Sequence, residues 1–309
     1  DIVVAGCSAA LHSDDYRQMP QVSGVVRGHD AVEVAGHIAP VDLSIERDEE
    51  PIGGELLDEN ERGTRGWMKI QDGCDRNCSF CATRLARGAS RSRTPDELVA
   101  EAHQLARRHR EIVFTGIHIG HYGRDRDDDM TLSRLVARLL EEVPGVRFRL
   151  GSIEATEIDD LMVDLLANSG GRLVPHLHVP MQSGSNAVLR RMQRWHTREQ
   201  YRDRVLEIAS RLPYLGLGAD VIVGFPGETD LEFEETRQLV EELPFTYLHV
   251  FPYSERDGTP AADLDYKVHG DIKARRSKQL REIAREKGES YRASRAGQGA
   301  EIVVEENGR

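Results

Sequence analysis

The chain has 309 residues, enough for one large domain with smaller appendages. Hydrophobic residues make up 39% and charged residues 30%, which is typical of soluble globular proteins, and the net charge of -12 argues weakly against a general nucleic-acid-binding protein. No apolar run is long enough to cross a bilayer, and the first residues lack the features of a signal peptide. Four cysteines, three of them closely spaced, favour a reducing cytoplasmic location over a disulfide framework.

Residues 1–50 are interpreted as the C-terminal part of a small α/β domain. Residues 2–5 are a short apolar strand candidate, and Gly6 and Cys7 stand at its end. Residues 51–65, rich in glycine and acidic side chains, are interpreted as a linker. Because the chain starts on Asp in a strand-like run and stops shortly after another, we expect a fragment of a longer protein.

From residue 66 onward, strand and helix patterns alternate regularly. The apolar strand candidates are residues 67–70, 112–115, 146–150, 176–179, 217–223 and 246–251. The helical patterns between them are residues 95–108, 132–143, 159–167, 198–211 and 231–243. Thr94 and Thr197 precede two of these patterns and are expected to cap the helices. This alternation predicts an α/β fold with a parallel sheet covered by helices.

These strands are too few for the closed eight-stranded barrel, so we expect a partial (β/α)6 barrel. Its chemistry is expected at the C-terminal ends of the strands, where the cysteine loop also begins. Residues 271–292 predict one long charged helix that completes a barrel domain over residues 66–292. Residues 293–309 are interpreted as the beginning of a small β domain.

Three clustered cysteines, Cys74, Cys78 and Cys81, are the clearest candidates for chemistry. Three thiolates can bind three irons of a four-iron four-sulfur (4Fe-4S) cluster and leave the fourth iron open to another ligand. A structural zinc site is the alternative, but such sites usually pair their cysteines in two halves, and this sequence has no second half. A cysteine nucleophile is less consistent with clustered thiols. We therefore expect an iron-sulfur cluster with an open iron.

The spacing of these cysteines, with Phe80 before the last of them, resembles the signature of the radical S-adenosylmethionine (SAM) superfamily. Longer stretches resemble its methylthiotransferases, namely residues 176–185, 220–229, 251–254 and 258–260. One departure is Arg84, where many relatives carry proline. The resemblance implies a radical SAM barrel in which the open iron chelates SAM. Reductive cleavage of SAM would then yield a 5'-deoxyadenosyl radical that removes hydrogen from an unactivated C–H bond.

The resemblance also implies positions that contact SAM. Phe80 is expected near the adenine. Thr115 and Gly116 end the second barrel strand and are expected near the SAM amino group, with an ordinary turn as the alternative. Glu154 and Gln182 follow the third and fourth strands and are expected at the same mouth.

Other candidates have stronger structural alternatives. Arg191 and Tyr253 can contact the cofactor, but arginines on helices and tyrosines at strand ends are usually structural. His176 and His178 alternate on one strand and share a face, where a packed, hydrogen-bonded pair is favoured over a metal site.

Cys7 is either a small apolar filler or a ligand of a second cluster. In methylthiotransferases an N-terminal domain supplies three cysteines to a second 4Fe-4S cluster, and residues 3–7 are similar to the setting of the last. The other two would lie upstream of this chain. We therefore expect an incomplete second cluster here, with sulfur insertion lost and SAM cleavage retained.

Three further stretches are most similar to the branch that modifies N6-threonylcarbamoyladenosine beside the tRNA anticodon: residues 70–74, 114–123 and 250–254. The alternatives within the family act on isopentenyl-adenosine in tRNA or on an aspartate of a ribosomal protein. The alternative of another class is a non-catalytic RNA-binding protein that contains zinc.

An RNA substrate would give the basic side chains a role. Arg84, Arg87 and Arg91, with Arg93, are expected to contact phosphates near the cluster. The basic residues between 273 and 287 would lead toward a TRAM-like RNA-binding β domain at 293–309, although a solvated helix face is the alternative. We also expect an external electron donor and sulfur source, a monomer, and no membrane association.

Overall fold

The computed structural model describes residues 2–28, 31–38, 64–300 and 302–304. The expected linker therefore lies almost entirely outside the described residues. The first described segment is a small α/β unit, in which two parallel strands are joined through two short helices. Its elements are β1 (Ile2–Gly6), α1 (Cys7–Leu11), α2 (Ser13–Arg17), β2 (Val22–Arg27) and α3 (Ala31–Ile38). The boundaries of this domain stay a prediction.

The six expected strands form two parallel three-stranded sheets in the described part of the chain. The first has the order β3 (Arg65–Lys69), β6 (Glu111–Thr115), β7 (Arg147–Leu150), and the second β8 (His176–His178), β9 (Gly216–Val223), β10 (Tyr247–Pro252). Isolated parallel bridges between Phe148 and Leu173 and between Ser152 and His178 connect the two halves. The partial parallel barrel is therefore confirmed, and no pairing among the described residues closes it between β3 and β10.

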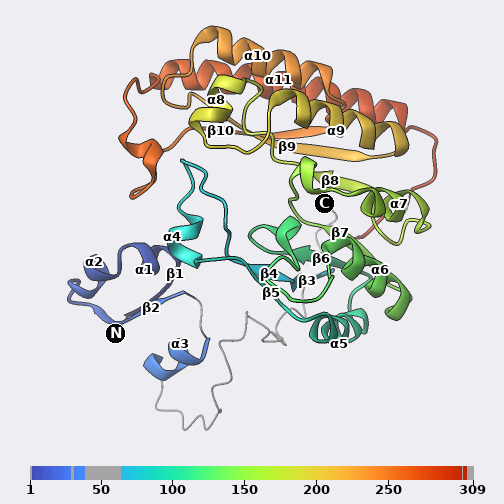
Figure 1. Cartoon of the computed structure of the whole chain (residues 1–309), viewed down its shortest axis with the longest axis horizontal. Helices are drawn as coiled ribbons and strands as arrows, with labels where there is room; N and C mark the ends of the chain where they lie inside the picture. Colours follow the sequence, from blue (N-terminus) through green and yellow to red (C-terminus); the bar gives the residue numbers. More distant parts are fainter. Residues whose placement is uncertain (1, 29–30, 39–63, 301, 305–309) are drawn as a thin grey trace.

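Helices cover the outer faces of both halves (Figure 1). They are α5 (Pro95–Ala106), α6 (Leu132–Glu142), α7 (Asp160–Asn168), α8 (Asn186–Arg191), α9 (Arg198–Arg211), α10 (Asp230–Glu242) and α11 (Gly270–Ser294). Short 3-10 helices lie at η2 (Ile119–His121), η3 (Ala155–Glu157) and η4 (Pro260–Asp263). Capping boxes at Thr94 and Thr197 are confirmed, and Thr229 adds one that was not predicted.

The core lies between the strands and the helices. On β6, Ile112 and Phe114 point outward into it, and the ring of Phe114 stacks on that of Phe148 at 5.2 Å. Alternate residues of the same strand face the barrel interior, where Glu111 accepts hydrogen bonds from Arg65 (2.9 Å) and Arg149 (2.7 Å). The inner face of β6 thus carries a charged cluster where the strand begins, while its outer face is apolar.

The basic C-terminal helix is held on the barrel by its own charges. The side chain of Arg276 is 3% exposed and donates to Oε2 of Glu228 and Oδ1 of Asp230, both at 2.8 Å. Lys273 donates to the carbonyl of Tyr253 at 3.0 Å. Part of the segment that we expected to lead toward RNA therefore stabilises the fold. None of the described helices is long and apolar enough to span a bilayer.

The helix α11 ends two residues beyond its expected end, so it includes residues 293 and 294. Residues 302–304 run without strand pairing, and Thr64 Oγ1 donates to the carbonyl of Val304 at 3.0 Å. The remainder of the expected β strand lies outside the described residues. The β domain stays a prediction.

We predict that Arg276→Met lowers the free energy of unfolding by about 3–5 kcal/mol, because it leaves the buried Glu228 carboxylate without its charged partner. Urea denaturation followed by circular dichroism measures the change. The control is Arg275→Met, whose side chain is 60% exposed and lies 3.6 Å from Asp230; it should change little. Equal effects of the two substitutions would contradict the assignment.

Candidate active site

The loop that carries the three cysteines is closed at its base by a short antiparallel pair that the sequence did not predict. The pair consists of β4 (Gln71–Asp72) and β5 (Arg91–Ser92), and α4 (Thr83–Arg87) lies between them. Gly73 follows β4 with a φ of 72°, and a Cβ there would lie 1.8 Å from the carbonyl oxygen of Ala89. Only glycine can occupy that position. The cysteines therefore lie on a defined loop that follows the first barrel strand.

All three cysteines are free thiols. Cys74 and Cys78 are half-buried and Cys81 is exposed. The backbone N–H of Arg76 donates to the Cys74 sulfur at 3.4 Å, and the Cys81 thiol donates to Oγ1 of Thr83 at 3.0 Å. Free thiols on one closed loop suit metal binding, and the cluster that they would hold stays a prediction.

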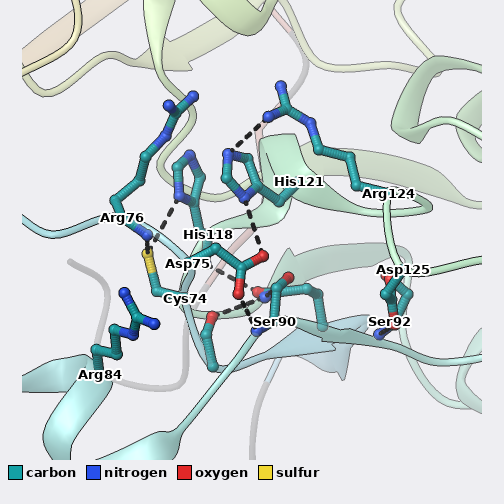
Figure 2. Close-up of polar contacts among 12 residues, drawn as sticks. Cys74, Asp75, Arg76, Arg84, Ser90, Ser92, His118, His121, Arg124 and Asp125 are labelled. Atoms are coloured by element: carbon teal, nitrogen blue, oxygen red, sulfur yellow. Dashed lines mark hydrogen bonds and ion pairs between the residues drawn. The ribbon is translucent and has the colours of Figure 1, made fainter.

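A buried carboxylate organises the side of the loop next to Cys74. Nδ1 of His118 lies 3.4 Å from the Cys74 sulfur (Figure 2), and its Nε2 lies 2.7 Å from Oε2 of Glu157. The Glu157 side chain is 4% exposed, and its Oε1 also lies 2.8 Å from Arg76 and 3.2 Å from His121. Arg124 lies 3.6 Å from the same oxygen, so two histidines and two arginines converge on one carboxylate.

The pKa values of this group follow from these contacts. Burial alone would lower the pKa of His118, but hydrogen bonds with Cys74 and Glu157 raise it to about 9. Burial alone would raise the pKa of Glu157, but hydrogen bonds from His118 and His121 hold it well below its ordinary range. Ligand atoms of these two histidines and Glu157 lie within 4.8 Å of one another, as in a metal site. Because His118 contacts Cys74 and Glu157 pairs with Arg76, a hydrogen-bonded network is favoured over a metal site here.

A second charged pair lies beside Cys78. The side chain of Arg194 is 3% exposed and donates to Oε2 of Glu154 at 2.5 Å, while its Nη1 lies 3.6 Å from the Cys78 sulfur. Burial raises the pKa of Glu154, and Arg194 opposes that shift. The guanidinium carbons of Arg194 and Arg76 lie 4.2 Å and 3.9 Å from a ring centroid of Trp195. The two sides of the loop therefore meet at this tryptophan. Glu154 follows β7, at the C-terminal ends of the strands, and its carboxylate already accepts a hydrogen bond from Arg194.

Four residues of this site were not predicted from the sequence: His118, His121, Glu157 and Arg194. The two histidines follow the second barrel strand, within a stretch used only to compare branches of the family. Polar residues that follow neighbouring parallel strands lie close together at the C-terminal edge of the sheet. The position of these histidines directly after a strand could therefore have indicated a role in the site. Arg194 offered no such signal, because its approach to Cys78 depends on packing between segments distant in sequence.

Thr115 and Gly116 lie at the end of β6, as predicted. Their close contacts are with Ile70 and Gln71 of this chain. The carbonyl of Thr115 accepts from the N–H of Ile70 at 2.9 Å. A Cβ at Gly116 would lie 2.8 Å from the carbonyl oxygen of Gln71, and Oε1 of Gln71 accepts from the N–H of His118 at 2.8 Å. Glycine is required here by the base of the cysteine loop. A contact with SAM stays a prediction.

Gln182 has a φ of 64°, which is uncommon for a residue with a side chain. Its N–H donates to the carbonyl of Asp220 at 2.9 Å, and its carbonyl accepts from the N–H of Ile222 at 2.9 Å. Backbone strain of this kind concentrates at functional sites. The conformation therefore supports the prediction that Gln182 has a role at this mouth.

Phe80 and Tyr253 meet in a small apolar cluster behind the cysteine loop. Phe80 packs on its buried members, Val188, Met192, Phe225, Tyr253 and Ala261. The hydroxyl of Tyr253 is buried and has no hydrogen-bond partner among the described residues. A buried hydroxyl without a partner is a group that a ligand can satisfy. Contacts of both residues with SAM stay predictions.

The side chain of Arg191 is hydrogen-bonded to other residues of this chain. Its Nη1 and Nη2 donate to the two carboxylate oxygens of Glu232, each at 2.9 Å, and Nη2 also reaches the carbonyl of Gly227 at 3.3 Å. This bidentate pair agrees with the structural alternative. A role in cofactor binding stays a prediction.

Cys7 begins α1, which lies beside α4 (Figure 1). Nε of Arg87 lies 3.2 Å from the Cys7 sulfur, and its Nη1 lies 3.3 Å from Oδ2 of Asp72. Arg87 therefore connects the N-terminal unit to the base of the cysteine loop. The sequence analysis had assigned it to RNA alone.

The other arginines near the loop differ in exposure. Arg84 and Arg91 are exposed, and Arg84 donates to the side chain of Asn77. Arg93 is buried, pairs with Glu101 and donates to the carbonyl of a β3 residue at 3.0 Å, so its expected phosphate contact does not agree with its position.

We predict that Glu157→Gln lowers the free energy of unfolding by about 3–5 kcal/mol. The substitution removes the one negative charge that neutralises His118 and Arg76 in a buried setting. Anaerobic urea denaturation measures it. Glu142→Gln is the matched control, since that side chain is 41% exposed and pairs within its own helix. If both variants lose the same stability, the Glu157 network does not have the role assigned to it.

Comparison with known proteins agrees with this geometry. Residues 68–240 match the family model of the Radical SAM superfamily. The threonylcarbamoyladenosine tRNA methylthiotransferase MtaB of Bacillus subtilis is 40% identical over 320 residues, which cover 99% of this chain and 69% of that protein. Its namesake in Rickettsia prowazekii is 35% identical over 312 residues, covering 99% and 73%. The tRNA-2-methylthio-N(6)-dimethylallyladenosine synthase of Staphylococcus saprophyticus is 40% identical over 224 residues, covering 71% and 43%.

Solved structures agree on the fold. The coproporphyrinogen III oxidase HemN of Escherichia coli, described as a radical SAM enzyme, has a TM-score of 0.54 at 17% identity and covers 74% of this chain and 54% of its own. The radical SAM methyltransferase TsrM of Kitasatospora setae has a TM-score of 0.55 at 17% identity, covering 65% and 39%. At this identity the likeness concerns the fold alone. The alignment over nearly the whole chain goes further, and the chain belongs to the tRNA methylthiotransferases of the radical SAM superfamily.

Proposed function

We propose that this chain carries the catalytic barrel of an enzyme that converts N6-threonylcarbamoyladenosine beside the tRNA anticodon to its 2-methylthio derivative. One observation carries the choice of substrate. Relatives named for threonylcarbamoyladenosine align along 98–99% of the chain, including the N-terminal unit, whereas relatives named for dimethylallyladenosine align along 71–78%.

The residues present suit the cofactors that the family implies, a 4Fe-4S cluster and SAM. Cys74, Cys78 and Cys81 would hold the cluster, since they are free thiols on one loop with nitrogen donors aimed at two of the sulfurs. Bound together, the cluster and SAM supply a radical able to remove hydrogen from an unactivated C–H bond.

The chain's own residues would position the cofactor and stabilise charge. Arg194 offers a buried positive charge to the Cys78 sulfur, and His118 offers one to Cys74. Gln182 with its strained backbone and Tyr253 with its unpartnered hydroxyl are the candidates to bind polar groups of SAM.

An adenosine in tRNA must leave its stack to reach this mouth. Trp67 on β3 and Phe251 on β10 are 55% and 49% exposed, on strands at the two edges of the partial barrel, and offer aromatic faces to a base. Arg84 and Arg91, which are exposed near the cysteine loop, are the better candidates for phosphate contacts. The side chain of Arg87 is less accessible, at 18% exposed.

Cys7 would be one ligand of a second cluster. Its sulfur lies 3.2 Å from Arg87 of α4, the helix that follows Cys81. A cluster bound there would therefore lie near the cysteine loop. The external electron donor, the sulfur source, the monomeric state and the cytoplasmic location belong to the same proposal.

The substrate is tested in cells. In a strain that lacks the gene, mass spectrometry of tRNA nucleosides should show the 2-methylthio derivative of threonylcarbamoyladenosine replaced by threonylcarbamoyladenosine itself. The wild-type gene should restore it, and Cys81→Ala should not. Loss of the methylthio group from isopentenyl-adenosine, with threonylcarbamoyladenosine unaffected, would overturn the assignment.

We predict that Arg194→Met lowers the reduction potential of the cluster. A positive charge near a cysteine sulfur stabilises the reduced, more negative cluster, and the substitution removes it. An anaerobic redox titration followed by electron paramagnetic resonance (EPR) measures the potential.

Two variants make that measurement specific. Arg194→Lys keeps the charge and should retain most of the potential. Arg190→Met changes an exposed arginine of the preceding helix α8 and should leave the potential unchanged. A potential that does not fall in Arg194→Met would exclude an electrostatic role for this side chain.

A further inference from the structure

The second half of the barrel carries a group of polar side chains that the proposed reaction does not use. His178 on β8, Asp220 on β9 and His249 on β10 lie on neighbouring parallel strands. Each offers a ligand atom, and these atoms lie within 4.8 Å of one another. Because β10 pairs His249 with Asp220 in register, the strand geometry itself holds two of the three side chains together.

The distances agree with ligands around one cation. Oδ1 of Asp220 lies 3.0 Å from Nε2 of His178 and 3.2 Å from Nδ1 of His249. In an octahedral site with bonds of about 2.1 Å, adjacent ligand atoms are about 3.0 Å apart. Two histidines and one carboxylate occupy one side of such an ion and leave the other positions open.

The second ring nitrogen of His178 supports the same reading. Nδ1 of His178 lies 3.0 Å from the hydroxyl of Tyr247, which also lies 3.0 Å from Nε2 of His176. A histidine that binds a metal through one nitrogen almost always engages a hydrogen-bond partner through the other. Tyr247 is held in place because Gly218 leaves room for its ring: a Cβ there would lie 1.9 Å from the ring carbon Cζ.

The site is accessible on one side. The side chain of His178 is 10% exposed, that of Asp220 25% and that of His249 57%. Water or an oxygen atom of a substrate can therefore complete the coordination. The cysteine loop follows β3, in the other half of the barrel, so its residues do not supply ligands here.

We infer that His178, Asp220 and His249 form a site for a divalent first-row metal ion on the interior of the barrel, with Tyr247 as the hydrogen-bond partner that orients His178. Two imidazoles and a carboxylate suit Mn²⁺ or Fe²⁺ with water in the remaining positions. The site does not depend on which nucleoside the enzyme modifies.

Mn²⁺ titration of the full chain tests the inference. The cluster is reconstituted anaerobically and kept oxidised, so that it has no net spin, and EPR at room temperature measures free Mn²⁺. We expect one bound equivalent. Asp220→Asn and His249→Ala should weaken binding at least about 100-fold, and Tyr247→Phe about 10–100-fold.

The control is His121→Ala, which disrupts the other group of two histidines and a carboxylate and should leave Mn²⁺ binding unchanged. Loss of binding in His121→Ala with full binding in Asp220→Asn would assign the ion to the other group and overturn the inference. Absence of any stoichiometric binding to the wild-type chain would overturn it as well.

A spectroscopic measurement on the wild-type chain avoids the question of whether a variant folds. Electron spin echo envelope modulation of bound Mn²⁺ should show coupling to two imidazole nitrogens. A spectrum without imidazole coupling would mean that the ion binds elsewhere.

Discussion

The buried carboxylate of Glu157 is the constraint on which the catalytic edge of the barrel depends. Arg76 belongs to the cysteine loop, His118 follows β6 and Glu157 follows β7, so one carboxylate connects segments that leave three different strands. A buried charge without a partner is costly, and these segments therefore cannot separate without exposing or stranding a charge. The position of Cys74 is fixed by this network as much as by its own loop.

The base of the same loop is held in a second way. Asp72 accepts from Lys69 at 2.7 Å and pairs with Arg87 at 3.3 Å, and Gly73 allows the backbone to pass close to Ala89. Arg87 also contacts the Cys7 sulfur. Movement of the N-terminal unit would therefore displace Arg87 and change its contact with Asp72 at the base of the loop. Polar contacts of Arg87 thus join the N-terminal unit to the base of the loop.

Sequence patterns were sufficient for the barrel and insufficient for its polar contacts. Strands and helices followed from periodicity, since β6 reads as a buried apolar run and Thr94 as a cap. The pair β4–β5 was missed because two residues in each strand produce no periodic signal. Charge alone was misleading: Arg276 belonged to an apparently solvated basic segment, yet it is 2% exposed, because burial depends on whether a partner such as Glu228 is present across the fold.

The interior of a partial barrel explains why polar groups gather there. A closed eight-stranded barrel fills its interior with layers of side chains, whereas this barrel is open between β3 and β10 in the part of the chain that is described. Charged side chains on the inner face are tolerated because they are paired: Glu111, whose side chain is 0% exposed, pairs with Arg65 at 2.9 Å and Arg149 at 2.7 Å. Glu111 and its arginines occupy the end where the strands begin, and Asp220 with its histidines lies further along. The interior of the described barrel therefore carries paired charged side chains at the start of the strands and a more exposed polar group further along them.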